Sequence, residues 1–193
     1  SDYESIPVST ILDATSSLDF TNPVTGLTMT DVQAGAELTG WTRSSVNTTI
    51  SASDDLAGIL RTEYSLDSGL SWTQYDAPFL VDGENITILY RSVDKAGNME
   101  ETKSALVPID RTPPEVTVSF DIESRDYVFT GVEDQPSTTV VLVNSSTVTV
   151  TDEAGNTTEI EFVKSETANG LGYFTKTLRI VNLRRNDGDW QTV

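Results

Sequence analysis

Cysteine and histidine are both absent from this sequence of 193 residues. Without cysteine there is no disulfide framework, no thiolate nucleophile and no cysteine-based zinc site. Without histidine the commonest general base and transition-metal ligand is missing. These absences exclude Ser-His-Asp hydrolases, cysteine proteases and most zinc enzymes, and they leave catalysis by carboxylates or by a hard metal ion.

Positive charge is also scarce, since 12 Lys and Arg stand against 30 Asp and Glu, which gives a net charge of −18 and a pI near 4.1. Nucleic acids and anionic membrane surfaces are bound through clustered Lys and Arg, so the sequence predicts neither as a partner. Hard cations complement such an acidic chain. The alternative is that surface acids keep an extracellular protein soluble.

Long apolar runs are missing as well, because no stretch approaches the roughly 20 apolar residues that span a bilayer. We therefore expect no membrane insertion. The N-terminus, S-D-Y-E-S, lacks the basic and apolar regions of a signal peptide. We expect the chain to be a segment of a longer secreted or surface protein whose export signal lies elsewhere.

Apolar and polar residues alternate with period two along much of the chain, and no window shows a convincing helical stripe. Such alternation is typical of antiparallel strands that bury one face and expose the other. The sequence therefore predicts an all-β protein. The clearest alternating runs are Val46–Ala52, Ile86–Arg91, Val116–Phe120, Thr147–Thr151 and Glu159–Phe162.

One five-residue motif, D-x-A-G-N, occurs at Asp94–Asn98 and again at Asp152–Asn156, an offset of 152 − 94 = 58 residues. Asp caps turn amides and Gly supplies a positive φ, so the motif predicts a tight hairpin turn. Two copies suggest two domains of one kind.

The Pro113-Pro114 pair cannot lie inside a central strand, so it indicates a connection between domains. We therefore predict one domain at 1–110 and a second at 111–193. The segment 13–40 is expected to be an elaborated early connection.

Domain one resembles the bacterial Ig-like extracellular repeat of the OmpL β type. This resemblance covers most of the domain, and its features are specific as a set. It implies two tandem immunoglobulin-like antiparallel β-sandwich domains. The matching segments are Gly40-Trp41-Thr42, Ser51–Gly58, Thr62–Asp67, Trp72–Tyr75, Pro78-Phe79, Tyr90–Glu100 and Ile109–Pro114.

Domain two keeps D-x-A-G-N but lacks the aromatic middle of the repeat, so we interpret it as a shorter Ig-like relative with extra strands after Phe162. The resemblance implies spacers, display elements or accessory binding domains without catalysis. Function must be argued from sites, not from the fold alone.

Ser65–Trp72 fits the Asp-box pattern S-x-D-x-G-x-x-W of sialidase propellers. A propeller needs several copies at regular spacing, and this chain has one. We interpret the motif as a structural hairpin.

The aromatic residues of domain one support two interpretations. Ig-like cores bury a Trp and a Tyr, which favours a core role. Trp72 and Tyr75 would otherwise form a sugar-stacking platform. The complete set is Tyr64, Trp72, Tyr75, Phe79 and Tyr90.

Acidic residues near predicted strand ends are the candidate metal ligands. Calcium takes six to eight oxygen ligands, many from carboxylates, although no EF-hand spacing is present. The alternative is that these residues cap turns in water. The five candidates for a calcium site are Asp54, Asp55, Asp94, Glu100 and Asp110.

Four N-x-[ST] sequons begin at Asn47, Asn85, Asn144 and Asn156. Nine Asn among abundant Ser and Thr give about two by chance, so the sequence alone marks them as incidental.

The leading hypothesis is a non-catalytic spacer or display module of a larger extracellular or cell-surface protein, such as an adhesin. Its partners would be the other domains of that protein, with a polysaccharide or a cell-surface ligand as a further possibility. The alternative is an accessory carbohydrate-binding module. A glycosidase would need two carboxyl groups roughly 5–10 Å apart in a cleft, and no cleft-forming insertion is evident.

Overall fold

The computed structural model describes residues 19–133, 139–168 and 170–193, and within these residues it contains strands, turns and loops but no helix. The prediction of an all-β protein is confirmed. Since the described residues form no helix, they include none that is long and apolar enough to cross a membrane.

The chain divides into two compact units. Among the described residues, unit 1 comprises 19–38 and Ser44–Val107, and unit 2 comprises Thr39–Arg43 and the described part of Pro108–Val193. The predicted boundary lay three residues later, and it placed Thr39–Arg43 in the first domain. This short segment groups with unit 2 because Thr42 forms a parallel bridge with Ile109, in which Asp110 N donates to Thr42 O at 2.9 Å.

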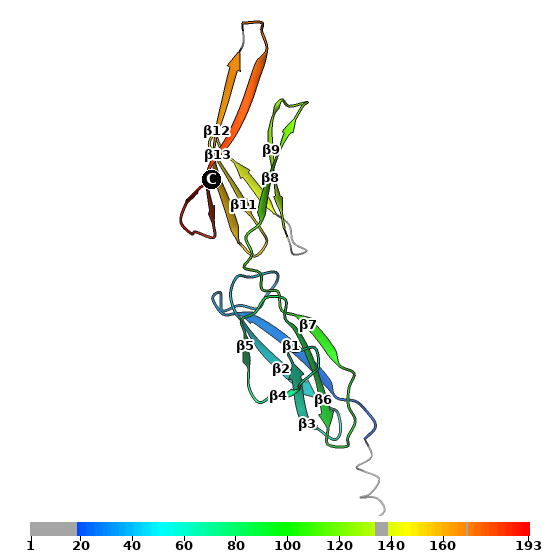
Figure 1. The fold of residues 1–193 in the computed structure, drawn as a ribbon. Helices are drawn as coiled ribbons and strands as arrows, with labels where there is room; N and C mark the ends of the chain where they lie inside the picture. The colour runs from blue at the N-terminus through cyan, green and yellow to red at the C-terminus, as the bar shows by residue number, and fades with distance from the viewer. Residues whose placement is uncertain (1–18, 134–138, 169) are drawn as a thin grey trace, which may run out of the picture. The chain divides into compact units, whose positions relative to one another are not determined.

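Unit 1 consists of two antiparallel sheets (Figure 1). Contacts of β1 with β6 and of β2 with β3 join the sheets, which gives a sandwich-like arrangement. The first sheet has the order β1 (Val24–Asp31), β2 (Val46–Ser53), β5 (Phe79–Val81). The second has the order β4 (Thr73–Gln74), β3 (Ile59–Ser65), β6 (Thr87–Asp94), β7 (Lys103–Leu106).

The interior of unit 1 combines aliphatic side chains with a polar centre. Val46, Ile50 and Ile88 are buried, as the alternation predicts. Between the sheets, the Thr25 hydroxyl on β1 lies 2.6 Å from the Ser92 hydroxyl on β6. Such buried hydroxyls are tolerated because they are hydrogen-bonded to one another.

Unit 2 also has two antiparallel sheets, and its core lies between them. Phe129 and Phe162 pack with ring centroids 5.1 Å apart, beside the fully buried Val148 and Val150. The smaller sheet pairs β8 (Glu115–Asp121) with β9 (Asp126–Val132). The larger has the order β10 (Val140–Val143), β11 (Thr147–Thr151), β12 (Thr157–Ala168), β13 (Phe174–Arg185), β14 (Gln191–Thr192).

The β12–β13 hairpin extends beyond the rest of its sheet (Figure 1). β11 pairs with β12 only as far as Glu161, whereas the β12–β13 ladder continues to Ala168 and Phe174. Every β12 side chain from Val163 to Ala168 is exposed. The alternating signal accordingly ends at Phe162, where the strand leaves the core.

Gly131 on β9 provides a test of how tightly the unit 2 core is packed. A Cβ at this position would lie 2.5 Å from Val150 Cγ1 and 2.6 Å from Thr139 Oγ1. We expect Gly131→Ala to lower the free energy of unfolding by roughly 1–3 kcal/mol, as overpacking does in other cores. Urea unfolding followed by circular dichroism measures this. Gly170→Ala, where a Cβ meets nothing within 4 Å, is the matched control, and equal stability of both variants would contradict the packing.

Candidate functional site: two acidic clusters

The two D-x-A-G-N turns have the same internal hydrogen bonds. Asp94 Oδ1 accepts from Asn98 N at 2.8 Å and Asp94 Oδ2 from Asn98 Nδ2 at 2.7 Å. Asp152 accepts the equivalent bonds from Asn156, both at 2.8 Å. Gly97 and Gly155 both take positive φ, at 96° and 87°, as the turn prediction requires. The sequence repeat is therefore also a structural repeat.

Each turn is also bonded to the segment that precedes the first strand of its own unit. Asn98 Nδ2 donates to Asp19 O, and Asn156 Nδ2 donates to Asp110 O, both at 3.0 Å. These two segments, Asp19–Pro23 and Asp110–Pro114, share the pattern D-x-T-x-P, offset by 110 − 19 = 91 residues. Each unit thus brings the same two motifs together.

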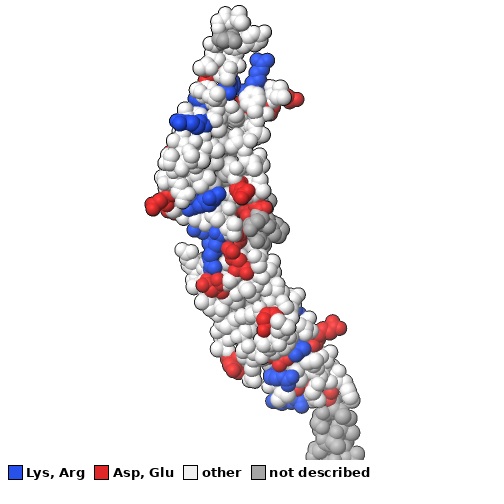
Figure 2. Space-filling model, viewed as in Figure 1, with Lys and Arg blue, Asp and Glu red and all other residues white. Residues whose placement is uncertain are grey.

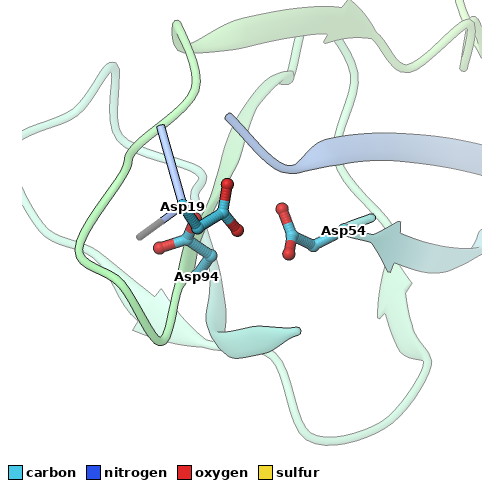
Figure 3. A group of neighbouring side chains, drawn as sticks. All are labelled: Asp19, Asp54 and Asp94. Atoms are coloured by element: carbon cyan, nitrogen blue, oxygen red, sulfur yellow. The ribbon is translucent and has the colours of Figure 1, made fainter. Parts of the chain in front are cut away.

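Acidic cluster 1 consists of Asp19, Asp54 and Asp94, each of which contributes a carboxylate oxygen to a group within 4.8 Å (Figure 3). Asp19 comes from the leading segment, Asp54 directly follows β2, and Asp94 ends β6. Asp19 and Asp94 are buried, whereas Asp54 is partly exposed. At such distances each pair of charges repels by roughly 3 kcal/mol at an effective dielectric constant of about 20.

Backbone amides stabilise part of this negative charge. Asp54 Oδ2 accepts from Gly58 N at 2.8 Å, and Asp19 Oδ2 accepts from Ala57 N at 2.9 Å. Bonds from the Thr21 hydroxyl and amide lower the pKa of Asp19, so this carboxyl group stays ionised. Asp54 Oδ1, in contrast, is buried and has no hydrogen-bond partner. A buried carboxylate oxygen of this kind is suited to bind a cation.

Acidic cluster 2 repeats the arrangement in unit 2 with Asp110, Glu133 and Asp152, again within 4.8 Å. Asp110 opens D-x-T-x-P as Asp19 does, and its Oδ1 accepts from Thr112 N at 2.9 Å. Glu133 directly follows β9, as Asp54 follows β2, and Asp152 opens the turn. The two clusters therefore come from equivalent places in the two units.

Two of the predicted calcium ligands lie outside both clusters. Asp55 is exposed and accepts from the Thr21 hydroxyl at 2.6 Å. Glu100 is 7% exposed, and Lys103 Nζ lies 2.9 Å from it. It accepts from Ser92 N on β6 and from the Thr25 amide and hydroxyl on β1. Glu100 thus bridges the two sheets, with its charge balanced by a lysine.

The candidate sugar-stacking residues are half-buried among other side chains. The Arg91 guanidinium lies 3.9 Å from the centroid of the Trp72 ring and covers one face of it. Tyr75 packs edge-on against Phe79 at 6.3 Å, and Phe79 in turn stacks on Tyr64 at 4.0 Å. The Tyr64 and Phe79 rings join β3 to β5 across the two sheets, although neither ring is fully buried.

The Asp-box segment forms a turn between β3 and β4. Asp67 accepts from the Ser71 hydroxyl at 2.5 Å and from its amide at 2.9 Å, and also from the Ser65 hydroxyl. These bonds lower the pKa of Asp67 to about 2. Gly69 has a φ of 87°. The motif acts here as a single structural turn.

Comparison with known proteins adds no relative, because the chain matches no protein-family model, no curated protein and no solved structure. The OmpL-type resemblance therefore stays a prediction that rests on the motifs, and the site is interpreted from its own geometry.

The sequence predicted Asp54, Asp94 and Asp110 as metal ligands. It did not predict Asp19, Glu133 or Asp152 as ligands. The D-x-T-x-P repeat was a usable signal for Asp19, and the second D-x-A-G-N copy was one for Asp152. Glu133 gives no signal of its own, because its place is set by the end of β9 and not by a motif.

Glu100 gives the first test of these assignments. Burial raises its pKa, but hydrogen bonds from Thr25 and Lys103 outweigh burial and lower the pKa overall. A lowered carboxyl pKa stabilises the fold above the unfolded pKa, about 4.3, and this stability is lost as pH falls through the folded pKa. We expect Glu100→Gln to lower the free energy of unfolding by about 1–3 kcal/mol at pH 7. This difference in stability between the variant and the natural protein should shrink as the pH falls below about 4.3.

Urea unfolding between pH 2 and pH 7 measures this difference in stability. Glu101→Gln, at the exposed neighbouring residue, is the control and should be as stable as the natural protein. A loss of stability in Glu100→Gln that is constant over the whole pH range would contradict the bridging role.

Proposed function

We propose that the chain is a non-catalytic spacer or display segment of a larger secreted or cell-surface protein, built from two Ig-like sandwich modules of the OmpL type. The observation that carries this proposal is the repeated junction. In each unit a leading segment, the end of the second strand and a D-x-A-G-N turn meet in the same way. Repetition of one structural unit is characteristic of chains that extend or present other domains.

Five carboxyl groups are held in their ionised form by the contacts that the fold gives them, as in structural turns and bridges. Asp19, Glu63, Asp67, Glu100 and Asp126 all have pKa values shifted downward by hydrogen bonds or basic neighbours. The general acid of a glycosidase needs a raised pKa instead. Acidic and basic side chains are scattered over the face in view, and neither kind forms one dominant patch on that face (Figure 2).

Calcium is the cation that best suits the two clusters. Calcium accepts carboxylate, carbonyl and water oxygens in flexible geometry, and three carboxylates leave room for water ligands. In cluster 1, Asp54 Oδ1 would gain a partner, and the repulsion among the three carboxylates would be neutralised. A bound ion would tie the leading segment to β2 and β6 and so stiffen unit 1. Cluster 2 would do the same for unit 2.

A carbohydrate-binding role is the second candidate, favoured by one feature of unit 2. A groove of about 540 Å³ lies between the β8–β9 and β12–β13 turns. Its lining includes the exposed rings of Tyr173 and Phe174, which are 72% and 66% exposed, and the cations Arg125 and Lys176. Exposed aromatic faces with polar neighbours can stack on sugar rings. This groove is a better platform than Trp72 and Tyr75, whose rings are already packed.

Thermal unfolding in millimolar calcium and in EDTA tests the proposed cation sites. A site occupied at a hundredfold above its dissociation constant adds about 2.7 kcal/mol, so we expect the melting temperature to rise by several degrees. Asp54→Asn combined with Glu133→Gln should remove most of this rise, because one ligand is lost from each cluster. Glu101→Gln should keep the full rise. Superimposable melts of the natural chain with and without calcium would contradict the cation sites.

A further inference from the structure

The D-x-A-G-N turns show which strands of the two units correspond. β6 and β11 both run into this turn, and β7 and β12 follow it. β3 pairs with the other side of β6, as β10 does with β11, so β10 is the counterpart of β3. Tyr90 and Val148 are equivalent, since 148 − 90 = 58 is the offset of the turns. Their partners are Tyr64 and Val143, which therefore hold the same position in the two units.

Unit 2 has no counterpart of β4 and β5 among its described residues. In unit 1 both strands lie in the connection 66–86, between β3 and β6. There β4 pairs with Glu63 and Tyr64, and the Phe79 ring of β5 stacks on Tyr64 at 4.0 Å. In unit 2 the connection between β10 and β11 is only the turn 144–146. β10 is therefore left at the end of its sheet, at the edge that unit 1 covers.

The residues at this uncovered edge are apolar. Val143 faces the interior side of the sheet, because it pairs with the buried Val148, yet it is 52% exposed. Leu142 faces the outer side and is 60% exposed. Its counterpart in unit 1 is Glu63, which is paired with Arg91 at 2.7 Å. An apolar strand thus stands open in unit 2 where unit 1 has a charged and covered one.

β10 also lacks the features that keep sheet edges from pairing. Charged residues, proline and short length are the usual means of protecting an edge. Val140–Val143 contains no charged residue and no proline. Every other strand at the end of a described sheet carries a charged residue or is no longer than three residues. In a chain of net charge −18, β10 is thus an edge at which two copies can meet without opposing like charges.

The backbone of β10 presents hydrogen-bonding groups at the open edge. Asn144 N donates to Thr147 O at 2.8 Å where the ladder with β11 ends. Bonded and non-bonded pairs alternate along an antiparallel ladder, so Leu142 is bonded to β11 in the same way. It follows that the N–H and C=O groups of Val141 and Val143 face the open edge.

We propose that β10 pairs with β10 of a second copy of this chain, about a two-fold axis at Leu142. A two-fold axis perpendicular to the sheet makes the two strands antiparallel, as β4 is to β3. Leu142 then lies opposite the same residue of the second copy. Val141 and Val143 lie opposite each other and exchange the hydrogen bonds of the open edge. The inference goes beyond the spacer role, and it rests neither on the extracellular location nor on the cation sites.

Cross-linking through one introduced cysteine tests this register. The natural chain has no cysteine, so Leu142→Cys carries a single thiol. Residues opposite each other in a non-bonded antiparallel pair have Cα atoms about 4.5 Å apart, which a disulfide can bridge. We expect Leu142→Cys to form a covalent dimer under mild oxidation.

Val140→Cys is the matched control. Val140 lies on the same face of the same strand and is also 60% exposed, but in this register its two copies lie about 13 Å apart. It should therefore cross-link much more slowly than Leu142→Cys. Equal rates for the two variants, or no covalent dimer of Leu142→Cys, would overturn the proposed pairing.

Sedimentation of the full chain at concentrations up to roughly 1 mM tests the association itself. A strand of four residues makes a small interface, so we expect dimers that form only as the concentration rises. Leu142→Lys should abolish them, because two like charges would meet at the axis. Leu80→Lys, at a residue 58% exposed on the end strand β5, should associate as the natural chain does.

Circular dichroism should show both lysine variants folded, since each changed side chain is largely exposed. Dimers that persist in Leu142→Lys would overturn the inference. Monomers of the natural chain at every concentration would also overturn it, and they would leave the β10 edge to a strand of another protein.

Discussion

The junction in each unit depends on one asparagine, which donates through both its backbone amide and its side chain. Asn98 in unit 1 and Asn156 in unit 2 hold a buried aspartate through two bonds and a backbone carbonyl of the leading segment through a third. Hydrogen bonds to a charged carboxylate are worth about 1.5–3 kcal/mol, more than neutral ones. The leading segment is thereby fixed beside the turn, and the first strand of the unit follows directly from it.

This constraint has an electrostatic consequence. Fixing the leading segment beside the turn brings its aspartate close to that of the turn, and the end of the second strand adds a third carboxylate. The charge of the buried Glu100 is balanced in a different way, because Lys103 lies beside it and amides from both sheets donate to it. In cluster 1 the buried Asp54 Oδ1 lacks such a partner, which is why a cation rather than a side chain is proposed there.

The alternating runs predicted β2, β6, β8, β11 and the inner part of β12, because a sheet with one buried face imposes period two on its sequence. They missed β1, and the expectation that the segment 13–40 is only a connection was wrong, since β1 lies within it and pairs with β2 along its whole length. They identified Val46 and Ile50 on β2 and Val148 and Val150 on β11, all of them buried. The outer part of β12 was not predictable in this way, since its exposed residues are under no burial constraint.

The acidic site was predictable only in part. Asp94 stands in a recognisable turn and Asp110 beside a Pro-Pro pair, so local motifs identified both. Glu100 looked equivalent in the sequence, but its side chain points between the sheets toward Lys103 and Thr25. Asp19 lies 75 residues from its cluster partner Asp94 (94 − 19), and the D-x-T-x-P repeat marks Asp19 without indicating which residues it contacts.

The most direct test of the repeated cation site is a calcium titration followed by the backbone amide chemical shifts of the ¹⁵N-labelled chain. Gly58 and Asn98, which bond to cluster 1 carboxylates, should shift together and saturate, as should Thr112 and Asn156 at cluster 2. Ser71, whose amide bonds to the isolated turn acid Asp67, should stay in place. Shifts confined to these two groups are the predicted result. No shifts, or equal movement of Ser71, would contradict the account.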